Sequence, residues 1–168
     1  MGGSGGVGSF AIQFAKAAGA RVLATASARN QELLQDLGAD VSIDYESQDA
    51  VEIALAETGG EGLDAAFDIQ GPDLVARSLP AVKTFGRMAC ILPPEGDLTP
   101  LYRKNIALHG VMLTRERARL DEMRPLFERG QARPVLDEVL PLEEAARAHE
   151  RLDTGHGRGK IVLRVANA

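Results

Sequence analysis

Three glycines near the start of the sequence have the spacing of a phosphate-binding turn. Gly3, Gly5 and Gly8 form the pattern G-x-G-x-x-G, with Gly6 and Val7 inside it. In such a turn one glycine allows the tight bend, one lets the backbone touch a pyrophosphate, and one lets the following helix pack closely on a sheet. The helix then presents free N–H groups and a partial positive charge to the phosphates. The alternative interpretation is a flexible glycine-rich segment. A P-loop is excluded because no lysine follows Gly8.

The residues that follow the first expected strand indicate which dinucleotide such a turn would bind. A fold that prefers NAD places a carboxylate about 20 residues after the turn, where it holds the ribose hydroxyls. Here that stretch reads LATASARN and offers Ser27, Arg29 and Asn30 instead. A hydroxyl and a guanidinium suit the 2′-phosphate of NADPH, which a carboxylate would repel. We therefore predict NADPH as the cofactor. The alternative is that Ser27 caps the next helix and Arg29 is solvated.

Residues that could carry out chemistry without a cofactor are few. One cysteine and three scattered histidines do not make a zinc cluster, and Cys90 is expected to be a small core residue. Tyr45 and Tyr102 lack the lysine four positions later that a Tyr-x-x-x-Lys reductase requires. Because no acid/base pair or Ser–His–Asp arrangement is evident, no catalytic or metal-binding residue is assigned. Arg158 and Lys160 could reach an anion, but their charged run is interpreted as a solvated face.

The composition narrows the class of protein. The chain has 168 residues, 45% of them hydrophobic and 26% charged, which is typical of a soluble globular domain. Its net charge of −5 argues against a nucleic-acid backbone or an anionic membrane as the partner. One cysteine allows no internal disulfide, and neither a signal peptide nor an apolar run of about 18 residues is present. We expect a cytoplasmic protein with a small-molecule substrate.

Helical and strand patterns alternate along the chain with short connections. The first helix, residues 7–18, has a wide apolar face, with Ser9, Gln13 and Lys16 expected on its solvent side. Further helices are predicted at 30–37, 47–58 (capped by Ser47), 71–79, 118–130 and 141–155, and strands at 21–25, 41–45, 63–69, 86–92, 106–113 and 159–165. This order predicts an α/β fold of the Rossmann type, doubly wound, with a mostly parallel sheet and helices on both faces.

Several stretches together resemble a known family. They are GGSGGVGSFAIQFAKAAGARVLATAS, LGAD with IDY, GLDAAFDIQG, FGRMACILPPEG and LEEAARAHERLDTGHGRGKIVL. In this order they are similar to the cofactor-binding half of medium-chain dehydrogenases/reductases, in the zinc-independent quinone oxidoreductase-like branch. The resemblance implies a substrate domain and a strand of about five residues before the glycine turn. Residues 1–158 would then be an NAD(P)-binding domain that is incomplete at its N-terminus. Residues 159–168 would be a strand that packs on the substrate domain, free here to pair elsewhere, even in the vacant strand position.

The resemblance also assigns positions around the cofactor. Position 26, where the family pattern would put the acid, is alanine. Tyr45 resembles the residue beside the adenine end, and backbone groups at Ile69, Ile91 and Leu113 would hold the carboxamide and ribose of the nicotinamide end. These four positions also have ordinary interpretations, as packing or as strand ends. The family commonly dimerises by pairing a strand that here is residues 106–113, from Ile106 to Leu113, so a homodimer is expected.

These observations predict the cofactor-binding part of an NADPH-dependent oxidoreductase that passes a hydride to a quinone, enone or aldehyde. One alternative is the cofactor domain of a zinc-dependent alcohol dehydrogenase whose metal site lies outside these residues. Others are a catalytically silent NADP(H)-binding module and a domain that folds poorly and binds nothing.

Overall fold

Helices and strands alternate in a computed structural model of the chain, which describes residues 1–155 and 157–165. The helices are α1 (Gly8–Ala17), α2 (Gln31–Asp36), α3 (Ala50–Glu57), α4 (Pro72–Ser78), α5 (Thr99–Arg103), α6 (Arg117–Glu128) and α7 (Ala145–Asp153). The strands are β1 (Leu23–Ala26), β2 (Val41–Asp44), β3 (Leu63–Asp68), β4 (Val82–Cys90), β5 (Ala107–Gly110), β6 (Leu136–Pro141) and β7 (Lys160–Arg164). Short 3₁₀ turns lie at Ala28–Asn30 (η1), Leu79–Ala81 (η2) and Leu142–Glu144 (η3). His156 and residues 166–168 of the expected C-terminal segment lie outside the described residues.

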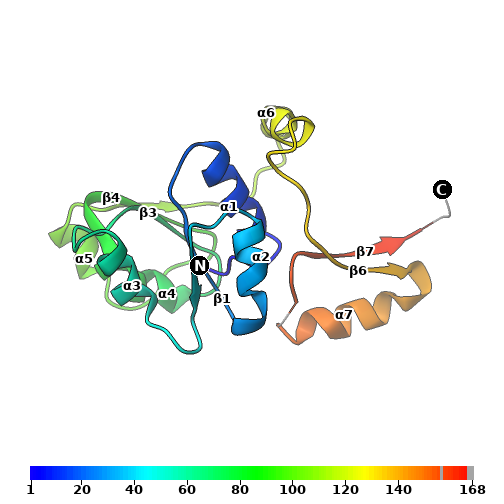
Figure 1. Ribbon diagram of the computed structural model, residues 1–168, viewed down its shortest axis with the longest axis horizontal. Coiled ribbons are helices and arrows are strands. Elements are labelled where there is room, and N and C mark those ends of the chain that lie inside the picture. The colour runs from blue at the N-terminus through cyan, green and yellow to red at the C-terminus, as the bar shows by residue number, and fades with distance from the viewer. Residues whose placement is uncertain (156, 166–168) are drawn as a thin grey trace.

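Within the described residues the strands form three separate parallel sheets. β1 pairs with β2, β4 lies between β3 and β5, and β6 pairs with β7. The prediction of an α/β fold with mostly parallel strands is confirmed. The first two sheets have no hydrogen-bonded strand in common in the described part of the chain. β6, β7 and α7 extend to one side of the other elements (Figure 1).

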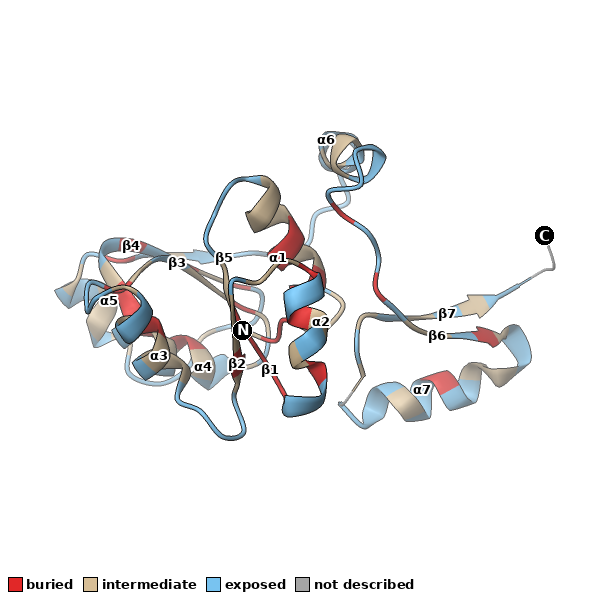
Figure 2. Ribbon diagram, in the orientation of Figure 1, coloured by how far each residue is buried: buried red, intermediate tan, exposed pale blue. Residues whose placement is uncertain are grey.

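Two apolar clusters stabilise the β1–β2 sheet and the β3–β4–β5 sheet. One joins α1, β1 and α2 through residues such as Ile12, Ala24 and Leu34, and Leu34 is fully buried. The other joins α4, β4 and the start of β5, with Val75, Met88 and others at its centre. Figure 2 shows these buried positions on the elements that surround the gap between the sheets. Burial of a leucine-sized side chain contributes about 2 kcal/mol, so each cluster holds its own half together.

Helix α1 is buried on a side that the pattern assigned to solvent. Ser9 is 1% exposed and Gln13 is 6% exposed, so the prediction of a solvent-facing position is wrong for both. The Gln13 side chain exchanges two hydrogen bonds with the backbone of Arg133, of 3.0 Å and 2.8 Å. These bonds satisfy a buried amide with a segment 120 residues away, which no local pattern reveals.

Other differences from the sequence prediction are local. Asp49, and not Ser47, caps α3: its carboxylate accepts from the N–H groups of Val51 and Glu52, whereas the Ser47 hydroxyl donates to Asp44. β5 ends at Gly110, short of the predicted end at residue 113. Helix α5 and strand β6 were not predicted. The C-terminal strand pairs with β6 and does not enter the gap between β1 and β3, which corrects that expectation.

Candidate dinucleotide-binding site

The glycine turn is hydrogen-bonded to the carboxyl end of β1. The Gly3 N–H donates to the Thr25 carbonyl at 2.8 Å, and the Gly2 N–H donates to the Thr25 hydroxyl at 3.2 Å. Within the turn the Gly5 N–H donates to the Gly2 carbonyl at 3.2 Å. α1 then begins at Gly8 with no side-chain cap. In its first turn the Ser9 N–H donates to the Gly5 carbonyl at 3.0 Å, while among the described residues the structure gives no acceptor for the N–H groups of Gly8 and Phe10. This is the arrangement in which a helix N-terminus attracts phosphate.

The steric surroundings of the glycines in the turn show that they have different roles. A Cβ at Gly8 would lie 2.1 Å from the Gly2 carbonyl oxygen, and a Cβ at Gly3 would lie 2.7 Å from Leu34. Both positions therefore need glycine for close packing within the protein. A Cβ at Gly5 would meet only the Gly2 oxygen, at 3.5 Å. Gly5 is thus the position where the backbone is open for close approach by a ligand.

The C-terminal segment closes one side of the turn. The Gly159 N–H donates to the Ser4 carbonyl at 2.7 Å, and Gly5 and Gly159 form a parallel bridge. Lys160 is exposed, and its Cε and Nζ atoms lie 2.5 Å from the position of a Cβ at Gly6. Sequence reasoning interpreted Lys160 as part of a solvated run. Only the tertiary fold brings this cation to the turn.

Ser27 and Asn30, two of the residues predicted to lie at the 2′-phosphate, are buried beside the turn. Ser27 is 9% exposed and Asn30 is 6% exposed. The Asn30 side chain donates to the hydroxyls of Ser4, at 3.3 Å, and Ser27, at 3.5 Å. The Ser27 side chain does not cap η1, which removes the capping role from the alternative interpretation. Arg29 is exposed on the same short turn.

The remaining predicted positions follow the carboxyl ends of other strands. Tyr45 is exposed just after β2, and its N–H donates to the Ala26 carbonyl at 3.3 Å. Ile69 follows β3, and the Ile91 N–H donates to the Asp68 carbonyl at 3.3 Å. Leu113 is 85% exposed in the segment beyond β5, and the structure gives no contact between it and the turn.

The ends of β1 and β3 meet at the first residues of the chain. The Met1 amine donates to the Phe67 carbonyl of β3 at 2.6 Å, two residues before Gly3 bonds to β1. The Gln70 side chain, which sequence reasoning did not select, packs against Gly2. The carboxyl ends of β1 and β3 therefore border the glycine turn, and β4 joins them through Ile91.

Among residues 1–155 and 157–165, no three His, Cys, Asp or Glu side chains gather as a possible metal site. Cys90 is buried in β4, in the predicted core position. No helix in the described part of the chain has the length and apolar character needed to cross a membrane.

Comparison with known families identifies the chain. A model of the zinc-binding dehydrogenase family matches residues 37–163. The chain belongs to this family. Zinc-binding dehydrogenases are medium-chain dehydrogenases/reductases, so the resemblance seen in the sequence is confirmed. The match does not include the glycine turn at residues 3–8.

Individual relatives cover the whole chain. The mitochondrial NAD(P)H oxidoreductase RTN4IP1 of Danio rerio is 30% identical, and the match spans 98% of this chain and 48% of the relative. A crystal structure of an NAD-dependent alcohol dehydrogenase is 33% identical, with a TM-score of 0.88, over 98% of this chain and 49% of that one. The structure of mycobacterial Rv1454c complexed with NADPH is 29% identical, with a TM-score of 0.84, over 97% and 55%. The Rossmann-type prediction is thereby confirmed. The chain spans about half the length of these relatives.

Proposed function

We propose that this zinc-binding dehydrogenase chain binds NADPH at the glycine turn and forms the cofactor-binding part of an oxidoreductase. The observation that carries the proposal is the turn itself. Its close-packed glycines hold the α1 N-terminus beside β1, and Gly5 leaves the backbone open. The oxidoreductase names of the relatives support the class of reaction.

The residues of the chain have separate roles in this proposal. The N–H groups at the start of α1 bind the pyrophosphate, and Lys160 supplies a positive charge against the turn. Ser27 and Arg29 bind the 2′-phosphate, while Asn30 holds Ser27 in place. The backbone after β3 and β4, at Ile69 and Ile91, orients the nicotinamide end. The bound cofactor supplies a hydride to a quinone, enone or aldehyde, and the chain's contribution is to fix the position of the ring.

The preference for NADPH over NADH rests on the end of β1. Residues 23–30 include no carboxylate that could hold ribose hydroxyls. A relative of known structure is described as complexed with NADPH, while another is named NAD-dependent, so the preference has to be measured on this chain. The second candidate function, the cofactor domain of a zinc-dependent alcohol dehydrogenase, is favoured by that second relative.

A homodimer is proposed through the strand region that contains Ile106 and Leu113. β5 has a hydrogen-bonded neighbour only on its β4 side within the described residues. Met112 and Leu113, just beyond it, are 84% and 85% exposed. An exposed strand edge beside apolar side chains is suited to pairing with its symmetry mate. Light scattering would give twice the monomer mass if this proposal holds. A cytoplasmic location stays a prediction from composition.

Calorimetric titration with NADPH and NADH tests the function directly. The wild-type chain should bind NADPH more tightly than NADH. Gly5→Val should abolish binding of both without unfolding the chain, because the new side chain points into open space where phosphate would lie. Gly110→Val is the matched control, since Gly110 is also open and lies in β5. A wild-type chain that folds cooperatively and binds neither nucleotide would contradict the proposal.

A further inference from the structure

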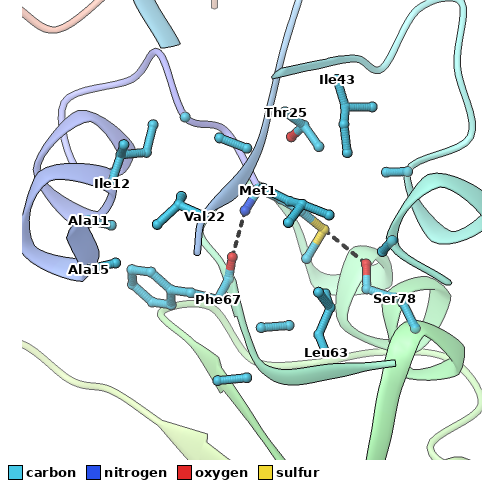
Figure 3. Close-up of a pocket in the computed structure, with 18 of the residues that line it drawn as sticks. Met1, Ala11, Ile12, Ala15, Val22, Thr25, Ile43, Leu63, Phe67 and Ser78 are labelled. Atoms are coloured by element: carbon cyan, nitrogen blue, oxygen red, sulfur yellow. Dashed lines mark hydrogen bonds between the residues drawn. The ribbon is translucent and has the colours of Figure 1, made fainter. Parts of the chain in front are cut away.

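An apolar cavity of about 400 Å³ lies between β1 and β3, beside the glycine turn. Ile12 of α1 and Phe67 of β3 line it together with Val22, which precedes β1 (Figure 3). Phosphate is bound by cations and N–H donors, and side chains of this kind offer neither. A positive charge for the turn comes instead from Lys160, which is distant in the sequence.

The backbone around Lys160 is bonded on two sides. The Gly159 N–H donates to the Ser4 carbonyl at 2.7 Å. The next N–H, that of Lys160, donates to the Val135 carbonyl at 2.9 Å. A Cβ at Gly159 would lie 2.1 Å from the Val135 oxygen, so this close approach requires glycine. The backbone of residues 159 and 160 is thereby fixed between the turn and the start of β6.

A bulge in β6 places Asp137 next to this segment. Leu136 pairs with Lys160, and Glu138 pairs with Ile161, so Asp137 is the extra residue between two successive pairs. Bulges redirect side chains and are common beside functional sites. The Asp137 side chain is only 12% exposed. Its carboxylate is therefore largely shielded from water, beside the backbone pair that Lys160 forms.

The Asp137 carboxylate joins two arginines from different segments. Its Oδ2 atom accepts a hydrogen bond from Arg151 of α7 at 3.3 Å, and its Oδ1 atom lies 3.5 Å from Nε of Arg158. Oδ2 is also 3.6 Å from the position that a Cβ at Gly157 would occupy. One carboxylate thus connects β6, α7 and the segment immediately before Lys160.

We propose that Asp137 is a positioning residue of the dinucleotide site, which holds residues 157–159 through Arg158 so that Lys160 lies on Gly6 of the glycine turn. The inference rests on the proposed function, because it requires Lys160 to contact the pyrophosphate. A fixed backbone leaves the lysine fewer conformations to lose when it binds a ligand, and this strengthens binding. Asp137 acts on the cofactor only through this segment.

The sign of the effect separates positioning from simple electrostatics. A carboxylate close to a phosphate site repels the phosphate, so removal of its charge alone would strengthen NADPH binding. Loss of a positioning contact would weaken it. Asp137→Asn keeps the size of the side chain and removes the charge, and we expect NADPH affinity to fall about fivefold.

Calorimetric titration of the 168-residue chain with NADPH tests the inference. In a Lys160→Met background, Asp137→Asn should cause no further loss, because a positioning residue acts only through the residue that it positions. Adenosine 2′-monophosphate, which has no pyrophosphate, should bind the wild type and Asp137→Asn equally well. A general loss of structure would weaken the binding of both ligands.

Asp121→Asn is the matched control. Asp121 also pairs with two arginines, Arg117 and Arg124, but all three lie on α6, which contributes nothing to the glycine turn. This variant should bind NADPH as the wild type does.

Arg158→Met is a second route to the same contact, should Asp137→Asn fail to fold. It breaks the ion pair from its more exposed side. Its loss of NADPH affinity, about threefold, should also vanish in the Lys160→Met background. A direct effect of the arginine charge on the phosphates would persist in that background.

The possible failures can be told apart. Equal or higher NADPH affinity in Asp137→Asn would overturn the inference and leave the proposed function intact. A loss that persists in the Lys160→Met background, or an equal loss of adenosine 2′-monophosphate binding, would do the same. A folded wild-type chain that does not bind NADPH would overturn the proposed function, and with it the role of Asp137.

Discussion

Lys160 lies against Gly6 of the glycine turn, although the two residues are at opposite ends of the chain. The Cε and Nζ atoms of Lys160 are 2.5 Å from the place that a Cβ of residue 6 would occupy. The bond from the Gly159 N–H to the Ser4 carbonyl holds the two segments together. A glycine is therefore required at position 6 for the lysine to lie there. The arrangement places a cation at Gly6, two residues before the start of α1.

Replacing this lysine should weaken NADPH binding without unfolding the chain. We expect about a tenfold loss for Lys160→Met, because a charge-assisted contact with phosphate is removed. Lys160→Arg should retain most of the affinity. The loss should shrink as salt screens the contact. Calorimetry at low and high salt measures both effects.

Lys83→Met is the matched control for that experiment. Lys83 is a half-buried lysine that pairs with Asp64 at the start of β3, away from the turn. If Lys83→Met weakened NADPH binding as much as Lys160→Met did, the contact with the turn would not be the cause.

Reversing the charge of Arg29 should change the choice of cofactor. Arg29→Glu places a carboxylate near the end of β1, where it would repel a 2′-phosphate and accept from ribose hydroxyls. We expect NADPH affinity to fall about tenfold while NADH affinity is unchanged or rises. Arg77→Glu, on the exposed face of α4, should leave the ratio of the two affinities as in the wild type. An unaltered ratio in Arg29→Glu would remove the 2′-phosphate role.

Local sequence patterns predicted those helices, strands and turns that are determined by neighbouring residues in the sequence. Helix α1 was recognised from its apolar spacing, and the turn before it from Gly3, Gly5 and Gly8. The alternation of elements predicted the parallel sheets. The resemblance to the family predicts that the two halves of the sheet have no strand in common, and in the described residues the β1–β2 and β3–β4–β5 sheets share none.

Local sequence patterns did not predict contacts between segments that are distant in the sequence. Gln13 is polar, and its position in the helical pattern predicts a solvent-facing side chain. It is nevertheless buried, because the Arg133 backbone forms hydrogen bonds with its side-chain amide. In the sequence Lys160 is one of several charged residues in a run, and only the tertiary fold places it next to Gly6. β6 contains a proline and two acidic residues, and among the described strands it pairs only with β7. Its strand character therefore depends on that partner.

The corrected cap of α3 gives a test of stability. Asp49→Ala removes the carboxylate that accepts from two backbone N–H groups, at 2.8 Å and 3.1 Å. We expect the free energy of unfolding to fall by about 1 kcal/mol. Ser47→Ala, at the position predicted from sequence, should cause a smaller loss because Ser47 bonds only to the Asp44 carboxylate. Urea unfolding of the three proteins measures the order, and a larger effect of Ser47→Ala would contradict the assignment.

The buried Met1 amine should make stability depend on pH. Burial lowers the pKa of the amine in the folded chain below its ordinary value of 8.0, and the nearby Asp68 carboxylate raises it by a smaller amount. Between the lowered value and 8.0 the unfolded chain binds more protons than the folded one, so the free energy of unfolding rises with pH across that window. Above the window both states are neutral and the amine contributes no further slope.

Urea unfolding of the polypeptide at a series of pH values from about 6 to 9 would measure this rise. The N-acetylated chain is the control, because acetylation removes the titrating group and keeps an N–H that can donate to the Phe67 carbonyl. Every other titratable group is common to the two proteins, so the difference between the two curves isolates the amine. That difference should grow in favour of the free amine as pH rises. A flat difference would mean that the amine is solvated in the folded protein.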